Sequence, residues 1–147
     1  MADSVNPILA QPRLGLAPAR RILEWALGRA QADGGPPVCL SLCDSQGELL
    51  HFLRMDGAPG RCIAIAQAKA YTAARFGAET RSLAERLRRE SLFLPDFQDA
   101  GLCSLPGGAP LLWQGHCIAA LGVSGRSLEA DEALCREAIL HAQTLLG

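Results

Sequence analysis

Lys69 and Asp56 are the residues whose types most readily suggest chemistry. Lys69 is the only lysine among 14 basic residues. A helical lysine most simply forms a structural ion pair, but it could also bind a carboxylate, or act as a base if burial lowers its pKa. Asp56 is most simply a turn residue that bonds backbone amides, or a carboxylate paired with Arg54 or Lys69. Adjacent Lys69 and Asp56 side chains could handle protons in an enzyme acting on a small acid or oxygenated metabolite.

The other reactive residue types form no standard catalytic or metal-binding motif. The chain has no P-loop, GxSxG or HExxH sequence, and Ser124 is expected to be a turn hydroxyl. Six cysteines contain no CxxC pair, so we expect buried reduced thiols, with a redox role for Cys62 as the weaker alternative. Two glycines, Gly107 and Gly108, shape a turn, and their amides could also form an anion-binding nest.

Length and composition favour one soluble globular domain. The chain has 147 residues, 49% of them hydrophobic and 20% charged, and a net charge of −1. The near-zero charge argues against a nucleic-acid-binding protein, which needs a basic excess. The longest apolar run, 117–123, is too short to cross a bilayer, and the first residues do not resemble a signal peptide. We therefore expect a cytoplasmic protein with no membrane contact.

The hydrophobic pattern predicts how these residues are positioned. Residues 1–15 read as a flexible arm before a single domain, 16–147. The predicted elements, in order, are a helix at 17–32, strands at 38–44 and 48–54, helices at 61–76 and 82–90, strands at 111–113 and 116–123, and a final helix capped by Ser127. Neighbouring strands with short turns form antiparallel hairpins. The fold class is α+β, with one antiparallel sheet packed by helices.

Four segments in the same order carry a resemblance to a known family. Residues 43–58 (CDSQGELLHFLRMDGA), 69–73 (KAYTA), 106–111 (PGGAPL) and 122–125 (GVSG, followed by Asp131-Glu132) are similar to motifs of the GlcG/HbpS family. The C-terminal domain of PduO-type proteins shares these motifs. The resemblance covers about residues 16–140. It departs at Arg126, which stands where the family usually has a glycine beside the expected pocket.

The resemblance implies a profilin-like α/β sandwich, homo-oligomers and, for some members, binding of haem or a related tetrapyrrole. We therefore expect a small-ligand-binding module with a pocket near an oligomer interface. A haem axial ligand needs an imidazole facing an apolar slot, and His51 fits that description, with Met55 nearby as a soft ligand. His51 shares a predicted strand face with Leu49 and Leu53, so a structural role in a core or interface is the simpler interpretation.

The expected pocket has an apolar wall and an anion-binding end. The wall comprises Phe52, Met55, Tyr71, Phe76 and Val123. The anion-binding end comprises Arg54, Lys69 and the amides of Gly107 and Gly108. Further residues expected to line it are Asp56, Thr72, Pro106, Ser124 and Gly125. This hypothesis requires the loop after the second strand, the lysine-bearing helix and the double-glycine bend to meet at one cavity. The alternatives are the enzyme described above and a non-catalytic oligomeric subunit that associates through the small-residue helix face at 63–73.

Overall fold

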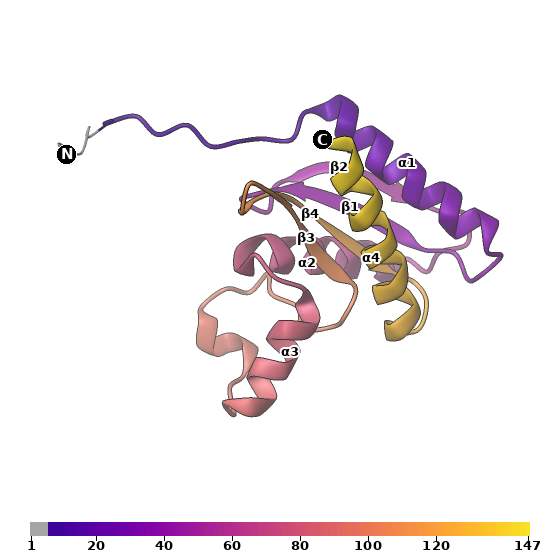
Figure 1. Cartoon of the computed structure of the whole chain (residues 1–147). Coiled ribbons are helices and arrows are strands. Elements are labelled where there is room, and N and C mark those ends of the chain that lie inside the picture. Colours follow the sequence, from indigo (N-terminus) through magenta and orange to yellow (C-terminus); the bar gives the residue numbers. More distant parts are fainter. Residues whose placement is uncertain (1–5) are drawn as a thin grey trace.

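A four-stranded antiparallel sheet forms the centre of the protein (Figure 1). The structure is a computed structural model that describes residues 6–147. The strands are β1 (Cys39–Asp44), β2 (Leu49–Arg54), β3 (Gly108–Trp113) and β4 (His116–Ser124), in the spatial order β2-β1-β4-β3. Two hairpins, β1–β2 and β3–β4, are therefore joined through the central β1–β4 pairing. The edge strands are β2 and β3.

Helices cover both faces of the sheet, and this arrangement confirms the α+β prediction. On one face lie α1 (Leu16–Ala32) and α4 (Leu128–Leu145), which pack against each other and against the strands (Figure 1). On the other face lies α2 (Arg61–Phe76). The short helices α3 (Thr80–Arg89) and η1 (Leu94–Phe97) follow it beyond the sheet. The predicted cap of the last helix is confirmed, because the side chain of Ser127 accepts a hydrogen bond from the amide of Ala130 at 3.1 Å.

The α1/α4 face holds the larger hydrophobic core. Helix α1 buries Ile22, Leu23 and Ala26 in this core, which also contains leucines of β1 such as Leu40 and Leu42. Alternate side chains of a strand point to opposite faces, so β1 sends Cys39, Ser41 and Cys43 towards α2 instead. These residues are buried as well. The central strand is therefore covered on both sides.

The α2 face is packed through small residues. Ala66, Ala70 and Ala73 of α2 are fully buried. A Cβ atom at Gly122 of β4 would overlap the carbonyl oxygen of Ala66, so only glycine permits this approach of helix to sheet. As a result α2 packs mainly on β4, β1 and β3, and it contacts little of β2. The β1–β2 side of this face is left less covered.

Three local features differ from the sequence prediction. Strand β3 begins at Gly108 rather than at residue 111, because Gly108 pairs with Gly122. Helix α3 begins at Thr80 rather than at residue 82, so Ser82 lies inside the helix. A β-bulge between Leu42 and Cys43 shifts the β1–β2 register. Residues 6–15 adopt neither helix nor strand, whereas residues 1–5 of the predicted arm lie outside the described residues.

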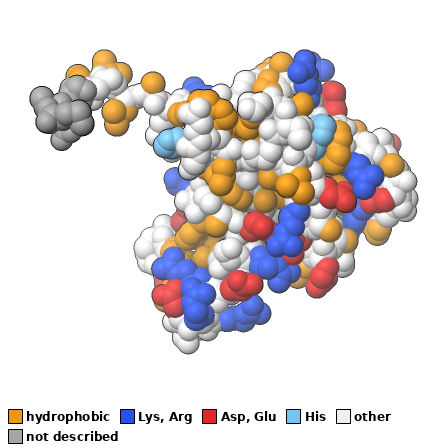
Figure 2. Space-filling view, viewed as in Figure 1, with side chains coloured by type: hydrophobic (Ala, Val, Ile, Leu, Met, Phe, Trp, Pro, Cys, Tyr) orange, Lys and Arg blue, Asp and Glu red, His pale blue; other side chains and the backbone are white. Residues whose placement is uncertain are grey.

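Charges of both signs lie side by side on the surface over α3 (Figure 2). The last turn of α3 carries Arg86, Arg88 and Arg89, and Glu90 pairs with Arg86 at 2.7 Å. Arginines outnumber glutamates here, four to two between residues 80 and 90, so this patch is locally basic although the overall charge is −1.

Candidate functional site

Lys69 is a buried structural residue. Its side chain is 1% exposed, and its Nζ donates to the carbonyl oxygen of Val123 at 2.7 Å and to Oδ2 of Asp131 at 3.1 Å. The third turn of α2 places Lys69 over the end of β4, where the first turn of α4 supplies the carboxylate. The structural ion pair that we took as the simpler interpretation is therefore confirmed, but its partner is Asp131.

The double-glycine bend packs directly on this ion pair. A Cβ atom at Gly107 would lie 2.8 Å from Nζ of Lys69, and one at Gly108 would overlap the Lys69 carbonyl. The amide of Gly108 donates to Oγ1 of Thr80 at 3.1 Å, so it is not free for an anion. The lysine helix and the glycine bend do meet, as we expected. However, they meet in a filled, buried cluster rather than at a cavity.

Opposing effects act on the Asp131 carboxyl. Burial raises the pKa of Asp131, whereas the Lys69 ammonium and the backbone amides of Arg126 and Gly125 act to lower it. The Arg126 amide donates to Oδ1 at 2.9 Å. A buried carboxylate with this many donors is tied to the turn between β4 and α4. Its role is to hold α2, β4 and α4 together.

Asp56 and Arg54 do not reach Lys69. Asp56 is exposed in the loop after β2, and the guanidinium of Arg54 donates to the carbonyl of Ala58 at 2.8 and 3.1 Å. The expected Lys69–Asp56 pair is therefore wrong, because Lys69 forms its ion pair with Asp131. The proton-handling enzyme hypothesis loses the contact on which it depended.

His51 and Phe52 lie on opposite faces of β2. His51 pairs with Leu42, whose side chain belongs to the α1/α4 core, whereas Phe52 packs on the α2 side near Cys39. Met55 also packs against the α1/α4 core, and its sulfur accepts from the amide of Val38 at 3.4 Å. The bulge places Leu49 on the α2 side, so the expected shared face of Leu49 and His51 is wrong.

The remaining predicted site residues are engaged in packing. Thr72 Oγ1 donates to the Ala68 carbonyl at 2.7 Å and accepts from the Cys103 amide at 2.8 Å. Phe76 contacts Phe97 edge-to-face. Val123 and Ser124, at the end of β4, are buried. Gly125 in the following turn and Pro106 before β3 are partly buried. Arg126 points away from α2 and bonds the end of α1 through Asp33, which lowers the pKa of that carboxyl.

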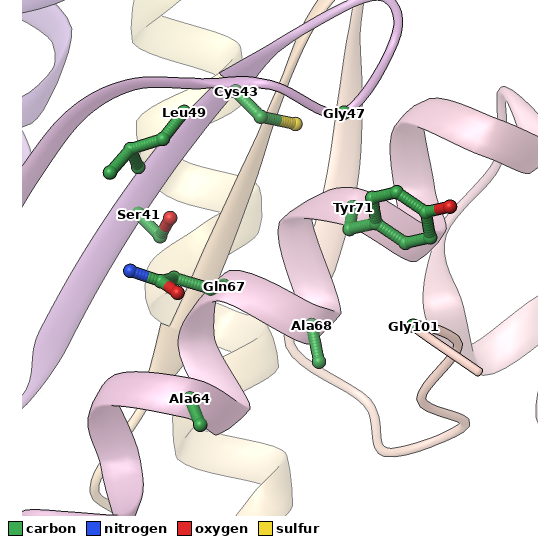
Figure 3. A pocket seen from close by; sticks show the side chains of 9 residues that line it. All are labelled: Ser41, Cys43, Gly47, Leu49, Ala64, Gln67, Ala68, Tyr71 and Gly101. Carbon is green, nitrogen blue, oxygen red and sulfur yellow. The ribbon is translucent and has the colours of Figure 1, made fainter.

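A hollow lies where α2 leaves the β1–β2 side uncovered (Figure 3). It has a volume of about 300 Å³. β1 forms its floor, β2 and the hairpin turn form one side, and α2 with the loop at residue 101 forms the other. Its lining residues are Ser41, Cys43, Gly47, Leu49, Ala64, Gln67, Ala68, Tyr71 and Gly101. We call this space the hairpin pocket.

Ser41 gives the hairpin pocket a polar floor. The residue is 1% exposed, and its Oγ has no hydrogen-bond partner in the protein. It is the one buried side-chain nitrogen or oxygen atom of residues 6–147 without such a partner. Leaving a buried hydroxyl unpaired costs about 1–3 kcal/mol, so such a group normally bonds a water molecule or a ligand.

Tyr71 forms a rigid wall of the same pocket. A Cβ atom on Gly47 or on Gly101 would collide with its ring, so the ring is held between the two glycines. Its hydroxyl donates to Asp99 at 2.8 Å and accepts from Nε of Arg75 at 3.0 Å. The hydroxyl is therefore already engaged, and Tyr71 presents its ring rather than a free polar group.

The pocket itself carries no charged side chain among its lining residues. Its thiol, Cys43, is buried, and burial raises the pKa of that thiol to about 12. At neutral pH the sulfur is therefore a protonated, weakly polar group. The hollow is an apolar slot with a hydroxyl at its floor and the Gln67 amide at its exposed mouth.

Residues 14–140 match the HbpS-like family, which is described as haem degrading protein HbpS-like. The chain belongs to this family. Among its relatives, an uncharacterized 15.0 kDa protein from the dhaT-dhaS intergenic region of Citrobacter freundii is 32% identical over 126 residues. That alignment covers 84% of this chain and 88% of the relative.

Solved structures of HbpS-like relatives share the whole architecture. A double mutant of HbpS from Streptomyces reticuli superimposes with a TM-score of 0.84 at 29% identity, covering 100% of this chain and 96% of that one. A PduOC–haem complex superimposes with a TM-score of 0.79 at 26% identity, covering 88% and 94%. The resemblance recognised from the four motifs is therefore confirmed, and the family is one of haem-related binding proteins.

Sequence reasoning missed most of the hairpin pocket in this HbpS-like protein. Of the residues predicted to line a site, only Tyr71 lies there. The signal that could have found Ser41 is its position as the one hydroxyl between the apolar residues of central strand β1, which ends at Asp44. Among residues 6–147, no three His, Cys, Asp or Glu side chains gather to hold a metal ion, and no helix is long and apolar enough to span a membrane.

Proposed function

We propose that this HbpS-like protein is a small-ligand-binding module and that the hairpin pocket is its site. The observation that carries the proposal is the unpaired Ser41 hydroxyl at the floor of an apolar slot. Ligand pockets usually combine an apolar lining with a few polar groups that fix orientation. The volume of about 300 Å³ lies at the small end of such sites.

A binding role is better supported than the enzyme alternative. Lys69 is held by Asp131 and Val123, and Asp56 is exposed in a separate loop. Neither residue lines the hairpin pocket. The pocket itself offers a protonated thiol, a hydroxyl and an amide without an adjacent base, a set that binds more readily than it catalyses.

The hairpin pocket does not fit haem. Its lining provides no imidazole or thioether, and its thiol has a pKa raised to about 12, so it is a poor source of the thiolate that haem iron binds. His51 and Met55 belong to the opposite face of the sheet. A slot of about 300 Å³ is also too small to enclose a four-ring macrocycle.

Haem binding outside this pocket is a second candidate function, and the structural likeness to the PduOC–haem complex favours it. The site would then use the partly exposed His51 on edge strand β2. Titration of hemin into the purified protein tests this idea through the Soret band. A shifted band that His51→Ala abolishes would support it. An unchanged band, or one that does not depend on His51, would remove it.

We also propose that the protein forms homo-oligomers. Leu49 is 53% exposed beside the mouth of the pocket, on an edge strand that α2 leaves uncovered. A second copy placed there would bury this leucine and bring an interface next to the site. Light scattering on the purified protein measures the mass directly, and a monomer at micromolar concentration would contradict the proposal.

Native mass spectrometry of the purified protein tests the binding function. Ala68→Phe fills the hairpin pocket from α2, and Ala17→Phe is a matched change at an exposed position of α1. We expect a bound small molecule in the wild type and in Ala17→Phe, and its loss in Ala68→Phe. A ligand retained by Ala68→Phe would show that the hairpin pocket is not the site.

A further inference from the structure

We propose that the hairpin pocket selects an uncharged molecule: a small apolar body that ends in one hydrogen-bonding group, which binds Ser41. This inference rests on the proposed binding function and specifies the chemical class of the ligand. It follows from the charge, the hydrogen-bonding capacity and the shape of the pocket.

The charge of the surroundings excludes an ionic ligand. None of the nine lining residues is charged. The two ions that bond Tyr71, Arg75 and Asp99, face each other at 3.5 Å and both bond the tyrosine hydroxyl. They are already paired, so they offer no counter-charge to a carboxylate or an amine in the slot. Moving an unpaired ion from water into such a site is strongly unfavourable.

The free hydrogen-bonding capacity of Ser41 at the floor favours a ligand that carries a neutral polar group. A serine hydroxyl can donate one hydrogen bond and accept two, and Ser41 uses none of these within the protein. The side-chain amide of Gln67 lines the same pocket as Ser41 (Figure 3). An amide, lactam or alcohol group could bond the hydroxyl and the side-chain amide together. A pure hydrocarbon would leave the hydroxyl unpaired.

The walls fix the shape of the remainder of the ligand. Leu49 stands on the β2 side, and the Tyr71 ring, immobilised between two glycines, stands on the α2 side. Ala64 and Ala68 are too small to fill the gap between them. The space suits a single flat ring or a short branched chain, whose apolar surface would contact the tyrosine face.

A matched pair of probes tests the charge preference. Benzamide and benzoate have nearly the same shape, but only benzoate is anionic at neutral pH. We expect benzamide to cause saturable shifts in the backbone NMR signals of Ser41, Gln67 and Gly101 of the full chain. We expect benzoate to bind at least tenfold more weakly. Ser41→Ala should weaken benzamide binding about tenfold, whereas the control Ser82→Ala, exposed on α3, should leave it unchanged.

The outcomes separate this inference from the binding function. Benzoate binding at these amides as tightly as benzamide would overturn the neutral-ligand inference and leave the pocket as a binding site. A benzamide affinity that Ser41→Ala does not change would also overturn it, as would a charged molecule found bound there by native mass spectrometry. If neither probe shifts these amides and no molecule copurifies, the inference and the binding function both fail.

Discussion

Replacing Lys69 by methionine tests whether the only lysine is structural. Methionine keeps the apolar length of the side chain and removes the ammonium. Asp131 then retains backbone amides but loses its counter-charge, and the Val123 carbonyl loses a donor at 2.7 Å. Removing one partner of a buried ion pair costs about 3–5 kcal/mol. Because domains are stable by only about 5–15 kcal/mol, we expect a large loss of stability.

Urea unfolding followed by circular dichroism measures this loss at pH 7. The double variant Lys69→Met/Asp131→Asn removes both charges and keeps an oxygen to accept from the Arg126 amide. We expect it to be more stable than Lys69→Met alone, since no uncompensated ion remains buried. This comparison isolates the coupling between the two residues.

The pH dependence of Lys69→Met gives a further check. Burial already raises the pKa of Asp131, and removing the lysine takes away the cation that opposes this shift. The folded variant then binds more protons than the unfolded chain between the two pKa values, so its stability falls as pH rises. We expect the deficit relative to wild type to be smallest in acid. A cost under 1 kcal/mol at pH 7, or a deficit that shrinks as pH rises, would refute the buried ion pair.

Three other predictions concern the hairpin pocket and the thiols. Ser41→Ala should raise the unfolding free energy of the ligand-free protein by about 1 kcal/mol, because it removes an unpaired buried hydroxyl; a destabilisation in urea unfolding would contradict this. Gly101→Val should lower the unfolding free energy by about 1–3 kcal/mol, because a Cβ there lies 2.8 Å from the Tyr71 ring. An unchanged melting temperature would show that the ring is not held against Gly101. Iodoacetamide at pH 8 should label the partly exposed Cys103 well before Cys43, whose pKa burial raises to about 12, as peptide mapping would show.

The sequence could predict the fold because local pattern and topology agree. Helices α1 and α2 form within one residue of their predicted bounds, and both bury small or apolar residues against the sheet. The hairpin turns were marked by Gly47 and Gly115, which have positive φ angles. The error that set Leu49 and His51 on one strand face arose from a β-bulge, which reverses the alternation and leaves no mark in hydrophobic periodicity.

The candidate site was harder to predict because it depends on contacts between distant elements. Asp131 and Lys69 are 62 positions apart, and an acidic residue in the first turn of a helix is common, so its type does not mark it as the partner of Lys69. The hairpin pocket exists because α2 leaves part of the sheet uncovered. No residue type in the sequence indicates where a helix will lie across the sheet. Ser41 is a common residue whose importance comes only from being buried without a partner.

The contact at Gly122 has a consequence for how the size of the hairpin pocket can change in this protein. Since α2 is anchored to β4 through Gly122 and Ala66, the helix cannot slide to close the gap over β2. Ala64 and Ala68 project from the opposite side of that anchor, where a longer side chain meets open space instead of the core. Point substitutions at these two positions would change the volume of the hairpin pocket at little cost to the free energy of unfolding. They are therefore the positions at which the pocket could be redesigned.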